Sequence, residues 1–501
     1  MGNDVVVPAG PAGRRHRLLI LAVLCTSILV VSMDVTIINV ALPALVTDLR
    51  ASITELQWTV DAYTVVLACF LMLAGATADR VGRRRVFQTG LVLFGIGSLL
   101  CSLAPTVGWL IGARVVQALG GAMLNPVAMS IITNVFTDVR ERARAIGVWG
   151  AMVGISLGVG PVLGGLLVDS VGWRAIFWVN IPVVLAAWVL TARLVPESRA
   201  ARPRRADPVG QLLVVALLGS TVAAVIEGPR LGWSSAGVLG LAVLAVVALV
   251  SLVVWERRHP EPLVELRFFR SAPFASATVI AVCAFAAFGS LLFLSALYLQ
   301  DVRGLGALQA GLTLLPAAVA TTVVAPLSGR MVAARGARLP LVLGGSAMVL
   351  VALTFSQLSP TTPLWLILLA HGVFGCGFAL LNPPITNTAV NGMPPERAGV
   401  AAAVASTSRQ AGQSFGVAVS GTVVATAAST AAGVATAWAV VTPLTVAVVV
   451  LGVLGTTARA RASAARVAAL FPRPRPPPAR PEREGPVALR RRRAARGRRR
   501  P

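Results

Sequence analysis

Long apolar runs recur along almost the whole chain. Runs of about 18 or more residues with few charges are long enough to cross a membrane as helices, and we count fourteen candidates between residues 18 and 457. Hydrophobic residues make up 56% of the 501 residues and charged residues only 13%, which argues against a soluble protein. A β-barrel would instead show short segments of alternating hydrophobicity. We therefore expect an all-α polytopic membrane protein.

The placement of arginine predicts how the spans are oriented. The net charge is +25 and the basic residues are all arginine. Arginines cluster in the tail 1–17 and in the even-numbered connections, whereas the odd-numbered connections carry few. Because cytoplasmic loops hold an excess of basic residues, we expect a multi-pass protein of a bacterial plasma membrane with both termini in the cytoplasm.

The C-terminal segment 458–501 is rich in arginine and proline. We expect it to be disordered and to lie near anionic lipid head groups. It contains no folded nucleic-acid-binding motif and no interleaved aromatic residues, so nucleic acid is not an expected partner.

The chain also repeats itself at an offset of about 255 residues. Gly75–Gly82 matches Gly329–Gly336, and the triplet LNP at 124–126 returns at 381–383. A constant offset indicates two parallel copies of one unit. We expect a first six-helix bundle at 18–195 and a second at 272–457, separated at 196–271 by an inserted helix pair with basic linkers.

Cysteine and histidine give no sign of chemistry. The five cysteines and three histidines are scattered singly, and no pair has the spacing of metal ligands. A nucleophilic triad and a phosphate-binding loop are also missing from the sequence. We therefore predict no metal site, no cofactor and no enzymatic activity.

Three charged residues interrupt apolar spans and are candidates for binding protons and substrate. Asp34 follows a charge-free run from Leu18 to Met33, and Asp61 and Arg114 lie at comparable depth in the second and fourth spans. Such residues are costly in lipid and usually serve a function. Loss of water favours a protonated carboxyl, whereas a neighbouring guanidinium favours the carboxylate. A static buried ion pair is the alternative for Asp34 and Arg114, and a hydrated helix end is the alternative for Asp61.

The fifth span combines small residues with a proline. Glycines at intervals of four form a flat face that lets another helix approach closely, and a proline bends the helix. The residues are Gly154, Gly158, Gly160, Pro161, Gly164 and Gly165. We expect a smooth surface between the two halves, although ordinary tight packing would give the same pattern.

The second connection, in the sequence GATADRVGRRRVF, has two glycines that permit close turns and a carboxylate beside several arginines. The residues of interest are Gly75, Asp79, Arg80, Gly82 and Arg83. A solvated basic loop is the simpler alternative.

These motifs resemble those of the major facilitator superfamily, in particular its 14-span drug:proton antiporters. GATADRVGRRRVF is similar to the loop motif that controls the conformational switch of the family, with Thr77 and Arg84 at positions where the family has Leu and Lys. MDVTIINVALP, RVVQALGGA and WRAIFWVNIP resemble further motifs, and GISLGVGPVLGG resembles the antiporter motif with Ser156 in place of a Gly.

The resemblance implies proton-driven efflux of drugs or antibiotics, amphipathic or cationic small molecules, by alternating access. The partners would be such a substrate, protons and the lipid bilayer. An exporter or symporter of a metabolite, such as a sugar, organic acid or amino acid, is the alternative. The sequence does not identify the substrate, the proton stoichiometry, the oligomeric state or which of Asp34 and Asp61 is the main coupling carboxylate.

Overall fold

The computed structural model describes residues 11–200, 207–390 and 398–471, and every regular element in these ranges is helical. The first group comprises α1 (Pro11–Leu49), α2 (Ile53–Val81), α3 (Arg83–Ser102), α4 (Val107–Val135), α5 (Val139–Ser170), α6 (Ala175–Trp178) and α7 (Asn180–Leu194). The middle pair is α8 (Pro208–Leu231) and α9 (Ala236–Arg258). The rest comprises η1 (Leu266–Arg270), α10 (Ala272–Leu297), η2 (Tyr298–Val302), α11 (Ala307–Thr313), α12 (Leu315–Arg335), α13 (Arg338–Phe355), α14 (Leu364–Val390), α15 (Ala398–Thr426), α16 (Thr430–Leu454) and α17 (Ala458–Ala469).

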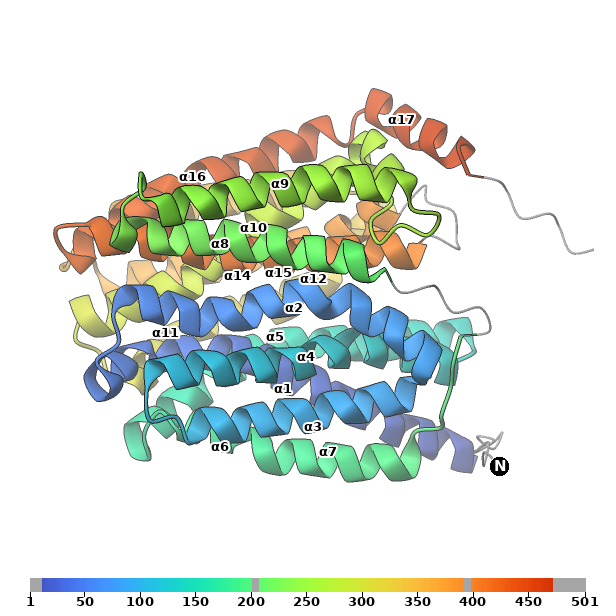
Figure 1. The fold of residues 1–501 in the computed structure, drawn as a ribbon, viewed down its shortest axis with the longest axis horizontal. Helices are drawn as coiled ribbons and strands as arrows, with labels where there is room; N and C mark the ends of the chain where they lie inside the picture. Colours follow the sequence, from blue (N-terminus) through green and yellow to red (C-terminus); the bar gives the residue numbers. More distant parts are fainter. Residues whose placement is uncertain (1–10, 201–206, 391–397, 472–501) are drawn as a thin grey trace, which may run out of the picture.

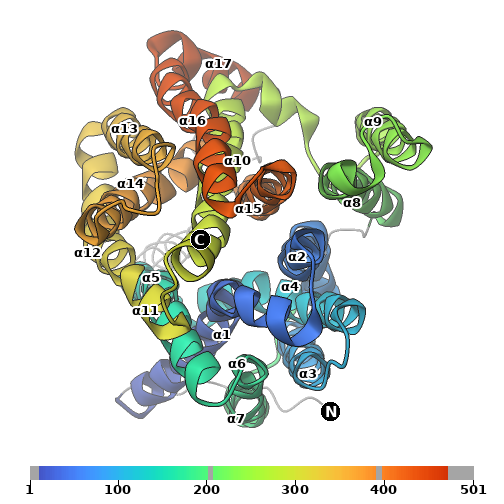
Figure 2. The same ribbon diagram turned by 90° about the vertical axis from the view of Figure 1, so that its left-hand side faces the viewer.

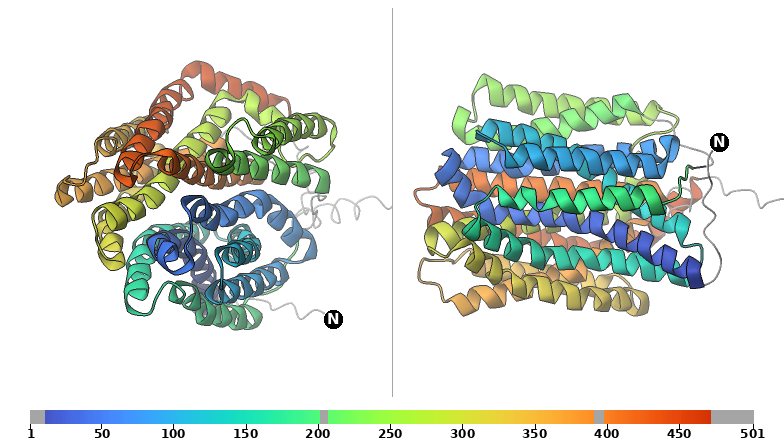
Figure 3. Two further views of the ribbon diagram at one scale, coloured as in Figure 1. Left: turned by 60° about the vertical axis from the view of Figure 1, so that its left-hand side comes forward. Right: turned by 90° about the horizontal axis from the view of Figure 1, so that it is seen from below.

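The long helices run roughly side by side (Figures 1 and 3). In Figure 2, α1–α7 form one group and α10–α16 a second, while α8 and α9 lie at the edge beside α2 and α15. We call the end of the bundle that holds Pro11 and Phe471 the proximal end, and the opposite end, with the α1–α2 turn, the distal end (Figure 1).

Thirteen helices of the described residues are long and apolar enough to cross a membrane, rather than the fourteen expected. The remaining candidate corresponds to α15, which has 29 residues and packs against α10 and α2. Its central sequence STSRQAGQS, at 406–414, is polar. Within this segment Ser408, Gln413 and Ser414 are buried, whereas the other polar side chains are partly exposed.

The start of the C-terminal segment differs from the expectation of disorder. Residues Ala458–Ala469 form α17, which Thr457 caps by accepting a hydrogen bond from the N–H of Ala460. The helix packs against α10 and η1, and Val467 joins a buried apolar cluster with Phe268. Burial of this apolar face explains why the segment is helical. Residues 472–501 lie outside the described residues.

The two groups of helices meet tightly near the distal end. An added Cβ on Gly165 of α5 would lie 2.5 Å from the carbonyl oxygen of Ala307, and one on Gly311 would lie 2.2 Å from that of Pro161. Only residues without a side chain allow this approach. The largest buried apolar cluster likewise contains residues of both groups, such as Ile38 and Leu294.

A helix cap also joins the two groups at the distal end. Asp169, near the end of α5, accepts hydrogen bonds from the backbone N–H groups of Ala307 (3.2 Å) and Leu308 (2.9 Å). The first N–H groups of a helix lack partners within that helix and attract negative charge. The first turn of α11 is therefore capped by a carboxylate from the other half of the protein.

We predict that Asp169→Ala separates the distal ends of α5 and α11 more often. A lost cap costs about 1 kcal/mol, and here the cost falls on the contact between the halves. The distance between spin labels on cysteines introduced at Val171 and Leu312 measures this opening. Asp138→Ala is the matched control, because Asp138 caps α5 within one half. Equal distance distributions in the two variants would contradict the prediction.

Candidate functional site

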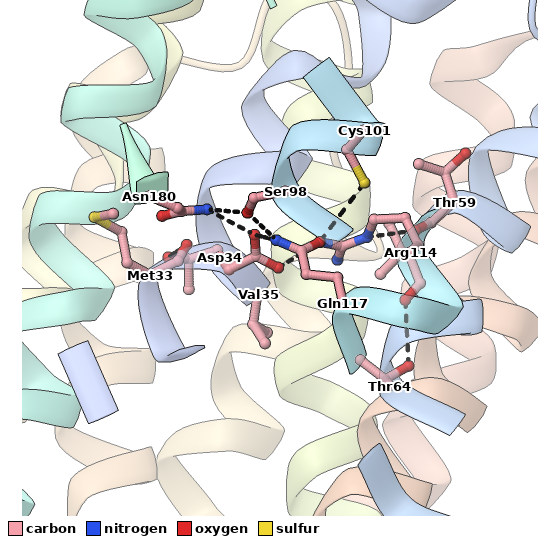
Figure 4. Close-up of polar contacts among 12 residues, drawn as sticks. Met33, Asp34, Val35, Thr59, Thr64, Ser98, Cys101, Arg114, Gln117 and Asn180 are labelled. Atoms are coloured by element: carbon pink, nitrogen blue, oxygen red, sulfur yellow. Dashed lines mark hydrogen bonds and ion pairs between the residues drawn. The ribbon is translucent and has the colours of Figure 1, made fainter. Parts of the chain in front are cut away.

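Asp34 lies at the centre of a buried polar network in the first group of helices (Figure 4). Its Oδ2 forms an ion pair with Nη1 of Arg114, and both side chains are fully buried. Its Oδ1 accepts hydrogen bonds from Nε2 of Gln117 (2.7 Å) and Nδ2 of Asn180 (3.3 Å). Three donors from α4 and α7 thus converge on this one carboxylate of α1. Such a charge is tolerated in an apolar interior because it is paired and hydrogen-bonded.

The amide groups around Asp34 are themselves held in place. Gln117 accepts a hydrogen bond from Arg114 at 2.8 Å, which fixes the orientation of its amide. Ser98 of α3 accepts hydrogen bonds from both Gln117 (2.8 Å) and Asn180 (3.1 Å). The network therefore ties α1, α3, α4 and α7 together.

Arg114 has further contacts on the side away from Asp34. Its Nε donates to the carbonyl oxygen of Thr59 at 3.2 Å, and its guanidinium carbon lies 4.2 Å from the centre of the Tyr63 ring. A guanidinium over an aromatic face gains a favourable cation–π interaction, which is stronger where water is excluded. Nη2 of Arg114 and the hydroxyl of Tyr63 have no hydrogen-bond partner within the part of the chain that the structure describes.

The sequence places Asp34 and Arg114 at comparable depth, where they can pair, but it does not single out the residues around them. Gln117 follows Arg114 by one helical turn, and Asn180 lies in the motif WRAIFWVNIP. The sequence does contain a signal for them: few polar side chains inside apolar spans can remain unpaired in lipid, so such residues are expected to contact one another. Which of them meet depends on the packing of four helices.

Asp61 lies apart from this network, at the contact between the two groups of helices. It is fully buried, and its Oδ1 accepts hydrogen bonds from Ser414 of α15 (2.8 Å) and Thr64 (3.2 Å). Its Oδ2 has no partner, and it makes no ion pair with the described residues. One turn away, Gln57 donates to the carbonyl oxygen of Ala418 at 2.7 Å. Two polar contacts thus join α2 to α15.

The small residues of α5 face three neighbouring helices, α1, α11 and α12. Added Cβ atoms on Gly154 and Gly158 would lie 2.8 Å from Thr322 Oγ1 and 3.0 Å from Ala318 Cβ, both on α12. Those on Gly160 and Gly164 would instead meet α1, at 2.0 and 2.5 Å. Gly165 and Pro161 contact α11, as described above. α5 is therefore the helix of the first group that packs closely on α11 and α12 of the second.

The loop between α2 and α3 is bound by the segment after α7. Asp79 forms an ion pair with Arg83 at 3.0 Å. Gly82 has a φ of +130°, and an added Cβ would lie 2.7 Å from Oε1 of Glu197. That oxygen accepts a hydrogen bond from the backbone N–H of Arg84 at 3.1 Å.

The remaining residues of this loop are less constrained. A Cβ added to Gly75 would meet Cβ of Pro126 at an ordinary 3.9 Å, and Arg80 is exposed. Glu197, which the sequence does not single out, thus holds the loop together with backbone hydrogen bonds from Arg83 to Ser198 (2.9 Å) and from Ala200 to Asp79 (3.1 Å). Among the described residues, no group of three or more His, Cys, Asp or Glu side chains could hold a metal ion.

The chain matches the Major Facilitator Superfamily over residues 24–417. Multidrug resistance protein Stp of Mycobacterium tuberculosis is 39% identical over 82% of this chain and 76% of its own. Methylenomycin A resistance protein of Streptomyces coelicolor is 36% identical over 83% of this chain and 88% of its own. The tetracenomycin C resistance and export protein of Streptomyces glaucescens is 35% identical over 81% of this chain and 75% of its own.

The fold agrees with this relationship. A crystal structure of the peptide transporter POT in complex with sulfate superimposes with a TM-score of 0.66, covers 93% of this chain and 98% of its own, and is 16% identical. The chain therefore belongs to the major facilitator superfamily and is a multi-pass plasma membrane transporter. The resemblance inferred from the motifs is confirmed, as is the prediction that the protein is not an enzyme.

We predict that Arg114→Gln strongly destabilises the protein, because it leaves the Asp34 carboxylate buried without a cation, at a cost of about 3–5 kcal/mol. Adding Asp34→Asn should restore most of the loss, since the second charge is then removed as well. Thermal unfolding in detergent measures both effects. The control is Arg174→Gln, which breaks the half-exposed pair with Asp48 and should cost about 0–1 kcal/mol. A double variant no more stable than the single one would contradict this account.

We predict that Gly82→Ala impairs transport and stability, whereas Gly75→Ala is tolerated. A side chain at Gly82 strains the backbone and displaces Glu197, whereas one at Gly75 meets only an ordinary contact. The measurements are thermal stability and transport rate for each variant. Equal effects at the two glycines would show that Glu197 does not hold the loop.

Proposed function

We propose that this protein exports drugs or antibiotics, amphipathic or cationic small molecules, in exchange for protons. The observation that carries the proposal is the fully buried Asp34–Arg114 pair, which sits among amide groups inside the bundle. Three relatives, at 35–39% identity, are described as proteins of drug or antibiotic resistance, and one also as an exporter. These relatives favour efflux over uptake of a metabolite.

The two buried aspartates have different surroundings, which suggests different roles. Asp34 is compensated by Arg114 and can exchange that partner for a proton or a cationic substrate. Asp61 has hydroxyl partners and no cation, and burying an isolated carboxylate is costly. In our proposal, Asp61 takes up a proton from the distal side when α2 and α15 separate there, holds it while the distal ends close, and releases it toward the proximal, cytoplasmic side before the next cycle. When neither a proton nor a substrate is bound, Arg114 pairs with Asp34, so the protein does not close around an unpaired carboxylate.

Alternating access would follow from rocking of the two halves. The glycine face of α5 against α11 and α12 offers a smooth contact for this motion, and the Asp79–Arg83 loop would regulate it from the other end of the bundle. A ligand shifts such an equilibrium only by its differential affinity for the two states.

We propose that fourteen spans cross the membrane, with α15 as the fourteenth, and that both termini are cytoplasmic because the basic connections lie at the proximal end.

The experiment that tests this function uses everted vesicles from a pump-deficient bacterial host. A susceptibility panel first identifies an exported compound, and its transport should then be accompanied by proton movement. Accumulation in the vesicles should stop when the proton and electrical gradients are collapsed. Transport that survives this collapse but requires ATP would contradict proton coupling.

We predict that Asp34→Asn abolishes uphill export while the protein still folds. Asn keeps nearly the same volume and can still accept hydrogen bonds, but it cannot bind and release a proton. Thermal stability must be measured beside transport, because Arg114 loses its partner. Asp61→Asn is the matched variant: it keeps a neutral group beside Ser414, so it should retain stability and lose proton coupling. Wild-type export by a folded Asp34→Asn protein would remove Asp34 from the mechanism.

A further inference from the structure

A groove of about 690 Å³ runs along the seam between α5 and the α11–α12 span. One wall contains Ile155, Val159 and Leu166 of α5, and the other contains Leu315, Val319 and Val323. The volume lies in the range of ligand-binding cavities. Because the two walls come from different halves of the protein, the groove depends on how the halves are arranged.

The groove lies at membrane depth and opens away from the protein interior. Both walls belong to helices that are long and apolar enough to cross a membrane, and its rim is exposed, with Val319 at 60% and Val323 at 68%. Thr322 is the polar side chain among the residues that line it, and its hydroxyl already donates to the carbonyl oxygen of Ala318 at 2.9 Å. The lining therefore favours an apolar occupant.

The length of the groove indicates which apolar occupant fits. Its lining extends along α5 from Gly154 to Leu166, which corresponds to about 18 Å at 1.5 Å per residue. α5 begins at Val139 and ends at Ser170, so the groove reaches from the middle of the helix toward the distal end. The hydrocarbon core of a bilayer is about 30 Å thick, about 15 Å per leaflet. The groove thus matches one leaflet in depth.

We propose that the groove binds one acyl chain of a membrane phospholipid from the leaflet at the distal end. An empty apolar groove would forfeit dispersion contacts along both walls, and a chain that lies between the walls contacts both halves at once. Lipid bound there would stabilise the arrangement in which the distal ends are closed. This inference does not depend on proton coupling or on the nature of the exported compound.

The outer surface of α9 provides a comparison within the same chain. Val243 and Val246 are 61% and 62% exposed, similar to Val319, but they do not line this groove. Lipid at α9 should exchange freely with the bilayer. A bound chain in the groove should be retained, because it packs against two helices rather than one.

The first test is retention of phospholipid during purification. Four proteins are purified in mild detergent and compared by native mass spectrometry. They are the wild type, the variants Val159→Trp and Val319→Trp, which fill the groove from opposite walls, and the control variant Val246→Trp. We expect the fraction carrying one phospholipid to fall about threefold or more in the two groove variants, because the chain loses its contacts with the walls. It should be unchanged in the control. Equal retention in all four proteins would overturn the proposal.

A second test avoids substitution, in case the groove variants fold poorly. The wild-type protein in nanodiscs is labelled with a phosphatidylglycerol that carries a photoreactive group near the end of one acyl chain. Cross-links should concentrate on peptides of α5 and α12 and should saturate with increasing probe. Even labelling of α9 and α12 would overturn the proposal. Displacement of the probe by an exported compound, but not by unlabelled phospholipid, would instead assign the groove to substrate.

Discussion

Membrane helices have little hydrophobic reason to prefer one another over lipid, so a buried ion pair places a strong constraint on how they assemble. Asp34 on α1 and Arg114 on α4 cannot be separated in an apolar interior without leaving a charge uncompensated. Gln117 and Asn180 complete the set of partners and bring in α7. The arrangement of the first half therefore depends on this network.

The contact between the halves is built differently. It consists of glycine-mediated close approaches along α5, two hydrogen-bonded contacts between α2 and α15, and the cap that Asp169 provides for α11. Each of these contacts can be broken without separating an ion pair. A rigid half and a separable interface are the mechanical requirements for alternating access. The seam groove adds a place where lipid can influence that interface.

Much of the fold can be predicted from the sequence, because helix length and apolar composition follow directly from the thickness of the bilayer. The helical class came from the long apolar runs and the family from patterns such as GATADRVGRRRVF and GISLGVGPVLGG, and the comparisons confirm the family. The span count differs at α15, whose polar middle segment makes this helix less apolar than the other spans. The helix α17 was missed because its stability comes from packing on α10 and η1.

The sequence by itself identified the charged residues that interrupt apolar spans, namely Asp34, Asp61 and Arg114, since the cost of burying a charge belongs to the residue type and to its apolar flanks. Tertiary structure alone decided their partners. It paired Asp34 with Arg114 and two amides, and it placed Asp61 against Ser414 of the other half, 353 positions along the chain. Depth along a span can be counted from the sequence, but the direction in which a side chain faces depends on helix rotation and packing, which many distant contacts set together.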